Sequence, residues 1–345
     1  MQRPPLPSPE LPPLLAGSAR TVVTGGAGFI GSHLAAELLR RGHCVHVVDD
    51  LSTGALDNLG EIAGHPRFSF TVGSAADPAT ARAMCRDADM VFHLAGVVGV
   101  RRLADEPLDV MQRNLRCCEV TLDAAAAARV PVLLTSSSEV YGDGPVPFRE
   151  GDPVRPGATE GLRGGYACAK AMAEWLAFGH AAQSGLAVVV ARLFNTVGPR
   201  QSGDHGMVLP RFVRQAVAND AITVYGSGAQ TRCFAHVGEV ARALVDLAVA
   251  PGVRGSVVNV GSGAETTVRD LAHLVKAVAG SGSHVVHVPF DAVFPAGFVD
   301  PPRRLPSLER LRRAIGWVPA KPVAAIVAEL VALERRGVLL PAERR

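Results

Sequence analysis

The sequence predicts an α/β protein built on a doubly wound parallel sheet, with a smaller C-terminal lobe. From residue 20 onward, short β-branched runs alternate with longer segments of helical period, which is the pattern of strand–helix–strand units. The chain has 345 residues, enough for one large core and a second, smaller one. After residue 192 the sequence changes to short elements between glycine- and proline-rich loops, where we place the second lobe.

Short apolar runs identify the strands, because parallel strands that are buried on both faces are continuously apolar. Six strands are predicted, at 21–24, 45–49, 68–72, 90–95, 132–136 and 188–192. Helices are predicted between them at 32–41, 107–129 and 166–184. Beyond them, elements are expected at 207–218, 222–225, 237–250, 257–260 and 267–279.

These elements divide the chain into three parts. Residues 1–19 are expected to form an extended lead-in, since the first 17 positions hold six prolines and lack the basic start and apolar core of a secretory signal. Residues 20–192 should form the sheet domain, with 236–262 packing back onto it. Residues 193–235 and 263–340 should form the second lobe.

Composition excludes several classes of partner. The net charge is +3 without a run of like charges, so nucleic acid is not an expected partner. No apolar stretch approaches the ~20 residues that cross a bilayer, so no membrane partner is expected. The six cysteines form no C-x-x-C pair and no histidines cluster with them, which predicts neither a zinc site nor a disulfide framework and favours a reducing, cytoplasmic setting.

A glycine-rich turn joins the first predicted strand to the first predicted helix. In Thr24-Gly-Gly-Ala-Gly-Phe-Ile-Gly31 the glycines let backbone N–H groups approach a pyrophosphate, and the helix N-terminus favours its negative charge. Asp49 ends the second strand, 24 residues after Gly25, where a carboxylate accepts hydrogen bonds from a ribose and repels a 2′-phosphate. The pattern predicts a Rossmann domain that binds NAD rather than NADP. The alternative is a plain turn with Asp49 capping a loop.

Tyr166 and Lys170 stand four residues apart and therefore share one face of a helix. An ammonium group there stabilises a tyrosinate, so the phenol can act as a base. Alone, the pair is typical of an ordinary helix surface. The hydroxyl run Thr135-Ser-Ser-Ser138, however, stands at the end of a predicted parallel strand, where open α/β sheets present their ligands, and one of its serine hydroxyls can share a substrate proton with the phenol.

Taken together, these motifs resemble the extended short-chain dehydrogenase/reductase family, in particular its nucleotide-sugar epimerases, decarboxylases and dehydratases. The resemblance covers residues 21 to about 319 and is carried by TGGAGFIGSH, DDLSTG, VFHLAG, SSSEVYG, YACAK and RLFNTVGPR. It implies Tyr166 as catalytic base, Lys170 as its electrostatic partner, and Ser137 as the hydroxyl that shares the proton. The residues it implies around the cofactor are Gly25, Gly28, Phe29, Ile30, Gly31, Asp49, Asp50, Ser52, Thr53, Gly54, Leu94, Ala95, Gly96, Lys170 and, as a supporting amide, Asn114.

One departure from the family pattern concerns the adenine. Ser74 stands where the family often has an acid that binds this base, so a weaker or backbone contact is expected there.

The resemblance also implies a substrate site in the second lobe. Asn195, Arg232 and Arg304 match positions that hold the diphosphate, for which guanidinium groups are suited. Tyr225 lies in the run that resembles the uracil-contacting strand, so UDP is the expected carrier. For each arginine, the alternative is a solvated surface side chain.

The substrate-binding set is completed by Ser138, Glu139, Arg192 and Arg101. Glu139 is a candidate base for the sugar C5, and Ser138 stands where some dehydratases carry an aspartic acid, which weakens the dehydratase interpretation. Arg192, with Arg101, is a candidate partner for a C6 carboxylate. Pairing of such an arginine with a structural acid is the equal alternative.

The expected function is therefore NAD-dependent 4-epimerisation of a UDP-sugar through a 4-keto intermediate, with UDP-glucuronate converted to UDP-galacturonate as the first choice. UDP-glucuronate decarboxylation is the runner-up, followed by UDP-glucose 4-epimerisation and sugar 4,6-dehydration. A dinucleotide-sensing scaffold is the non-catalytic alternative, against which the intact set of Ser137, Tyr166 and Lys170 argues. The resemblance further implies a homodimer formed through the helices at 107–129 and 166–184.

Overall fold

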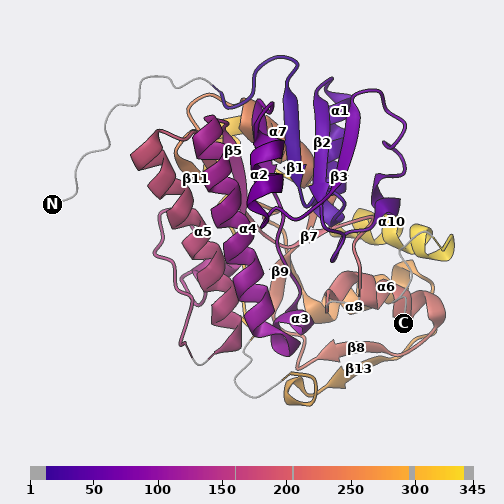
Figure 1. Cartoon of the computed structure of the whole chain (residues 1–345). Coiled ribbons are helices and arrows are strands. Elements are labelled where there is room, and N and C mark those ends of the chain that lie inside the picture. Colours follow the sequence, from indigo (N-terminus) through magenta and orange to yellow (C-terminus); the bar gives the residue numbers. More distant parts are fainter. Residues whose placement is uncertain (1–12, 160, 204–205, 295–299, 338–345) are drawn as a thin grey trace.

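A computed structural model of the chain describes residues 13–159, 161–203, 206–294 and 300–337. Its centre is a seven-stranded parallel sheet in the order β11-β6-β5-β4-β1-β2-β3 (Figure 1). The strands are β1 Arg20–Thr24, β2 Cys44–Asp49, β3 Phe68–Val72, β4 Met90–His93, β5 Val132–Ser137, β6 Val188–Leu193 and β11 Ser256–Val260. The order reverses at β1 and β4, which is where such sheets open a crevice at their carboxyl ends. The predicted fold class is confirmed.

Six of these strands match the predicted ones to within two residues at either end. The seventh, β11, lies next to β6 and follows α7 Val237–Val249, so the segment expected to pack back onto the sheet domain contributes a strand to the sheet itself. Its apolar run was assigned from sequence to the elements beyond residue 192, because nothing local distinguishes a returning strand from one that stays in a separate lobe.

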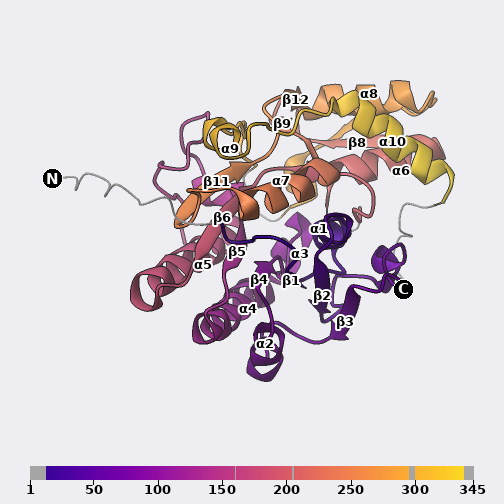
Figure 2. The ribbon, with the colours of Figure 1, turned by 90° about the horizontal axis from the view of Figure 1, so that it is seen from above.

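Helices cover both faces of the sheet. On one face α2 Pro78–Cys85, α4 Pro107–Ala128 and α5 Leu162–Ser184 pack on β4, β5 and β6 (Figure 2). On the other, α1 Phe29–Arg40 packs beside α7. Within the described ranges, none of the helices is long and apolar enough to cross a membrane.

The second lobe has its own apolar core. Helices α6 Val208–Ala218, α8 Val268–Val278 and α10 Val323–Arg335 pack against the strand pair β8 Ile222–Tyr225 and β13 Val285–Val288, burying Leu209, Phe212, Leu271 and Leu330 (Figure 1). The remaining elements are α3 Val100–Asp105, β7 Thr196–Val197, β9 Thr231–Cys233, β10 Ala235–His236, β12 Glu265–Thr267 and α9 Glu309–Ile315.

A buried ion pair ties α5 to the sheet. Glu174 accepts hydrogen bonds from Arg192 Nε at 2.9 Å and Nη2 at 2.7 Å, and the two side chains are only 6% and 5% exposed. Ser136, on β5, donates to the same carboxylate at 2.5 Å. Arg192 was expected to meet a sugar carboxylate, and this is wrong: its guanidinium is held by a structural acid, which was the alternative.

Replacing Arg192 with Met should lower the free energy of unfolding by about 3–5 kcal/mol, because Glu174 would remain as a buried, uncompensated charge. The double variant with Glu174→Met should recover much of that loss, since both charges are then removed. Urea denaturation of the two variants and the parent measures this. A single-variant cost below about 1 kcal/mol, or a double variant no more stable than the single one, contradicts the interpretation.

Candidate active site

A cavity of about 530 Å³ opens at the carboxyl edge of the sheet and reaches the second lobe. Residues at the ends of β1, β2, β4 and β5 form one side of its wall, and residues of α6, β8 and β9 form the other. The expected residues that line it are Gly25, Gly28, Phe29, Ile30, Gly31, Asp49, Asp50, Ser52, Thr53, Leu94, Ala95, Gly96, Ser137, Ser138, Glu139, Tyr166, Lys170, Asn195, Tyr225, Arg232 and Arg304.

The glycine turn leaves room and donors for a pyrophosphate. Gly25 has φ +69°, and a Cβ there would lie 2.8 Å from the backbone nitrogen of Ala95. A Cβ on Gly31 would lie 2.2 Å from the carbonyl oxygen of Gly25. Helix α1 begins at Phe29 after Gly28, which has no side chain to cap the first N–H groups, so those donors face the cavity as an anion site.

Two carboxylates stand at the end of β2. Asp49 is 7% exposed and accepts hydrogen bonds from Ala27 N at 2.9 Å and Leu51 N at 2.8 Å. Burial raises the pKa of Asp49, and these two hydrogen bonds oppose that rise. Asp50 pairs with Arg113 at 2.9 Å. A ribose with free hydroxyls fits this acidic end better than one carrying a 2′-phosphate.

Two expected cofactor residues lie behind the wall of the cavity. A Cβ on Gly54 would sit 3.0 Å from both carboxylate oxygens of Asp49, so this glycine makes room for Asp49 instead of lining the cavity. Asn114 donates to the carbonyl groups of Val97 at 2.8 Å and Val110 at 2.7 Å. Its place behind Gly96 fits the supporting role that the resemblance implies. Neither Gly54 nor Asn114 lines the cavity, so the direct contact with the cofactor that was expected of these two residues is wrong.

The acid–base centre joins α5 to the end of β5. Tyr166 is 8% exposed, and Lys170 Nζ donates to the carbonyl oxygen of Thr135 at 3.2 Å. Burial raises the pKa of Tyr166; the charge of Lys170 opposes this most strongly, and a hydrogen bond with Ser137 also lowers it. In the chain alone, burial therefore raises the pKa of Tyr166 more than Lys170 lowers it. From the sequence, the lysine was expected to bring the phenol toward ionisation near neutral pH.

Arg304 lines the same cavity as this centre. Its Nη2 donates to Glu139 Oε2 at 2.5 Å, and the residue is 5% exposed. Both side chains also act electrostatically on Tyr166, Glu139 raising and Arg304 lowering its pKa. The Arg304 Nε is buried and has no hydrogen-bond partner among the described residues. The guanidinium expected at the diphosphate thus keeps one unsatisfied donor and acts electrostatically on the phenol.

Two other residues expected to bind the substrate, Arg232 on β9 and Tyr225 on β8, line the cavity on the side of the second lobe. Arg232 pairs with Asp300 at 2.6 Å. The Tyr225 ring meets Phe294 edge-on, with centroids 5.8 Å apart, and the guanidinium carbon of Arg211 lies 3.9 Å from its centroid. Sequence reasoning missed Arg211, because an arginine in an amphipathic helix is typical of a solvated surface.

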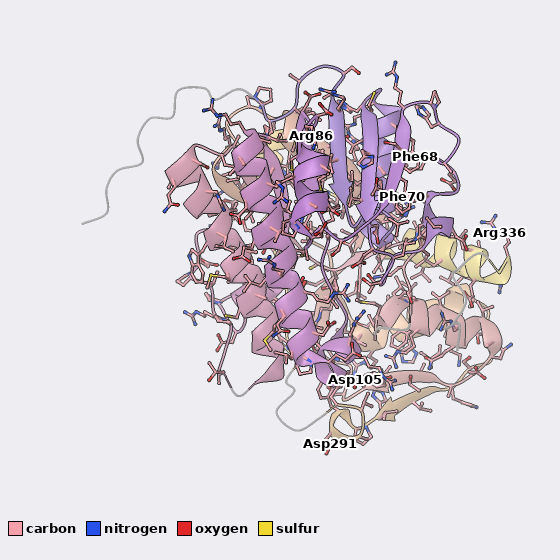
Figure 3. All side chains as sticks on the ribbon, viewed as in Figure 1. Phe68, Phe70, Arg86, Asp105, Asp291 and Arg336 are labelled. Carbon is pink, nitrogen blue, oxygen red and sulfur yellow. The ribbon has the colours of Figure 1, made fainter. Side chains whose placement is uncertain are left out.

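Arg101 does not belong to the site. Its side chain is 75% exposed and lies 3.6 Å from Asp105, the last residue of α3, which Figure 3 labels. Neither Arg101 nor Arg192 lines the cavity. The expected pair of arginines around a C6 carboxylate is therefore wrong for both members.

Comparison with known proteins agrees with this geometry. Residues 21–261 match the NAD dependent epimerase/dehydratase family. A UDP-N-acetyl-alpha-D-glucosaminuronate decarboxylase of Bacillus cytotoxicus is 38% identical over 302 residues, covering 87% of this chain and 92% of that protein. UDP-glucuronic acid decarboxylase 1 of Danio rerio is 34% identical, covering 88% of this chain and 70% of that protein.

The fold is also shared with a solved structure, a UDP-N-acetylglucosamine 4-epimerase from Methanobrevibacter ruminantium in complex with UDP-N-acetylmuramic acid. Its TM-score is 0.83 at 29% identity, covering 93% of this chain and all of that one. With the glycine turn, the acidic end of β2 and the Tyr166–Lys170 centre in place, the cofactor is NAD and the chain belongs to the NAD-dependent epimerase/dehydratase family.

Proposed function

We propose that this protein decarboxylates a UDP-hexuronate through a 4-keto sugar. The observation that carries the proposal is the buried Nε donor of Arg304, which has no partner among the described residues, on a side chain that lines the same cavity as Tyr166. A sugar carboxylate is the group that such a donor suits, because a charge-assisted hydrogen bond would satisfy it. The two curated relatives described above are both uronate decarboxylases, which supports the same choice.

The reaction begins at the sugar 4-hydroxyl. The ionised Tyr166 takes the proton from this hydroxyl, and Ser137 shares that proton by hydrogen bonding. Lys170 stabilises the negative charge of the phenolate before the proton is transferred. The glycine turn, Asp49 and Lys170 would hold NAD, which when bound would supply the hydride acceptor for C4 and a positive charge beside the phenol. The C4 ketone is then β to the C6 carboxylate. Carbon dioxide leaves with the C5–C6 bond electrons flowing toward the ketone, C5 takes up a proton, and Tyr166 finally returns a proton to the C4 oxygen.

Arg304 and Glu139 determine where the carboxylate lies in this scheme. Glu139 holds the guanidinium through Nη2, which leaves Nε to orient the carboxylate. Arg192, on which the epimerase choice for a uronate depended, is engaged by Glu174 and unavailable. Epimerisation was the first choice from sequence, with a uronate substrate because of Arg192; now that Arg192 is paired, we assign the uronate carboxylate to Arg304.

4-Epimerisation remains the second candidate. It uses the same Tyr166 centre to form the ketone, and the 4-epimerase from M. ruminantium shares the fold over 93% of this chain. Epimerisation would require the ketone to rotate before hydride returns, and would leave C6 in place.

We also propose a homodimer formed through α4 and α5. The two helices pack against each other, and they expose four large apolar side chains: Leu108, Leu115, Met172 and Trp175. Burial of such side chains against a second copy is the simplest way to remove them from water.

Incubation of the NAD-loaded enzyme with UDP-glucuronate, and separately with UDP-N-acetylglucosaminuronate, tests the proposed function. The expected result is carbon dioxide and a UDP-pentose, or its N-acetyl analogue, from at least one of them. Proton NMR of the nucleotide sugars and trapping of the gas are the measurements. Formation of the C4 epimer with C6 retained would establish the second candidate instead.

Replacing Tyr166 with Phe should reduce turnover by about 10²–10⁴-fold, because the proton of the 4-hydroxyl then has no acceptor. Binding of NAD should be unchanged. Cys168→Ser, an exposed position on the same helix, is the matched control and should keep full turnover. Turnover above a tenth of the parent value in the Tyr166 variant would remove the phenol from its assigned role.

Replacing Arg304 with Gln should lower kcat/KM for the uronate by about 100-fold, since one charged hydrogen bond contributes about 1.5–3 kcal/mol. The affinity for UDP should change less than about threefold. Arg303→Gln is the control, because Arg303 is 49% exposed and bonds Glu265. An equal loss of UDP affinity would return Arg304 to the diphosphate, where the sequence analysis placed it.

A further inference from the structure

Asn259 is a fully buried amide on β11 that lies outside the wall of the cavity. Its Nδ2 donates to the carbonyl oxygens of Phe148 at 3.0 Å and Ser307 at 3.2 Å. Its Oδ1 accepts from the hydroxyl of Tyr141 at 2.7 Å. Because carbonyl oxygens only accept, the two carbonyls determine which end of the amide is the nitrogen. One side chain thus joins three segments that are far apart in the sequence.

The first of these segments carries Glu139. It is the short helix η2 Ser138–Tyr141, which ends at the tyrosine. The Tyr141 ring is fully buried and stacks on Phe148 with centroids 4.7 Å apart. Burial raises the pKa of Tyr141 to about 12, so its hydroxyl keeps the proton that it donates to Asn259. This hydrogen bond fixes the end of the helix on which Glu139 lies.

The other two segments meet beside Arg304. The backbone nitrogen of Phe148 donates to the carbonyl of Leu305 at 2.8 Å, and the backbone nitrogen of Ser307 donates to the carbonyl of Phe148 at 2.8 Å. The Asn259 amide adds one hydrogen bond to each side of this ladder. Arg304 comes directly before the ladder in the chain, so its backbone is held by hydrogen bonds that converge on Asn259.

The ion pair of Glu139 and Arg304 cannot place itself. Their 2.5 Å contact sets the separation of the two side chains, but the backbones that carry them determine where the pair stands relative to Tyr166. Both backbones are tied to the same amide. Because β11 belongs to the same sheet as β5, this amide also ties the pair to the sheet edge that carries the acid–base centre.

We propose that Asn259, together with Tyr141, is a positioning residue that holds Glu139 and Arg304 in place relative to Tyr166. The inference rests on the proposed function only in taking this pair as the group that orients the sugar carboxylate. Loosening the amide would displace the guanidinium without removing it. A displacement of about 1 Å can cost about 100-fold in rate. Binding of UDP, which has no sugar carboxylate, should not depend on the amide.

Two variants test the two arms separately. Asn259→Asp keeps an oxygen that accepts from Tyr141, but it places a second oxygen against the two carbonyl groups and so removes both donors. Tyr141→Phe keeps the ring stacked on Phe148 and removes only the hydrogen bond to the amide. For the uronate, kcat should fall about 10–100-fold in Asn259→Asp and about 3–10-fold in Tyr141→Phe.

Three measurements distinguish positioning from a general loss of structure. Calorimetry should give a UDP affinity within about twofold of the parent in both variants, and a UDP-glucuronate affinity about 3–10-fold weaker in Asn259→Asp. The absorbance of reduced nicotinamide during turnover should rise, because the hydride step at Tyr166 is kept while loss of carbon dioxide is slowed. Trp317→Phe is the control, since it removes an aromatic hydrogen bond of 2.7 Å, to Asp246, outside the cavity, and should change none of these values.

Three results would overturn the inference. Values of kcat and of UDP-glucuronate affinity within about twofold of the parent in Asn259→Asp would show that the pair is held without the amide. A loss of UDP affinity as large as the loss of kcat would show that the network supports the whole cavity. An equal fall of kcat in Trp317→Phe would show a general effect of lost stability. If Asn259→Asp does not fold, the same measurements on Tyr141→Phe decide. Because the binding comparison needs no turnover, failure of the decarboxylase assay and failure of this inference are separate results.

Discussion

The burial of the Tyr166 phenol at the carboxyl edge of the sheet is the constraint on which the site depends. Burial keeps water from the reacting hydroxyl, and it also raises the pKa of the group that must act as a base. The chain offsets this with Lys170, whose ammonium is held on the Thr135 carbonyl. Since that offset is incomplete in the chain alone, the proposed function needs the positive charge of oxidised NAD to lower the pKa of the phenol further.

The charged groups along the cavity follow the order of the ligand groups that they would contact. The acidic end of β2 would face the ribose of the cofactor and the uncapped N–H groups of α1 its pyrophosphate, and Tyr166 and Arg304 line the same cavity. Most arginines of the wall pair with acids, and the Nε donors of Arg304 and Arg211 have no hydrogen-bond partner among the described residues.

The fold and the cofactor half of the site could be predicted because their signals are local. A strand, a glycine turn and a helix follow one another in the chain, and Tyr166 and Lys170 share a helix face through simple periodicity. The arginines could not be assigned, because their roles depend on partners far away in sequence. Arg192 lies next to the last residue of β6, where a substrate ligand could stand, but it pairs with Glu174 from α5. Arg304 lies 165 residues from Glu139, and only the fold brings the two together.

The fate of deuterium at C4 tests the central claim, that one hydride leaves the sugar and returns to it. UDP-hexuronate carrying deuterium at C4 would be converted in ordinary water, with the absorbance of reduced nicotinamide followed in parallel. The account predicts that reduced cofactor appears transiently, that turnover is slower than with the unlabelled sugar, and that the product retains deuterium at C4. Loss of the label to solvent, or product formed without any reduction of the cofactor, would contradict it.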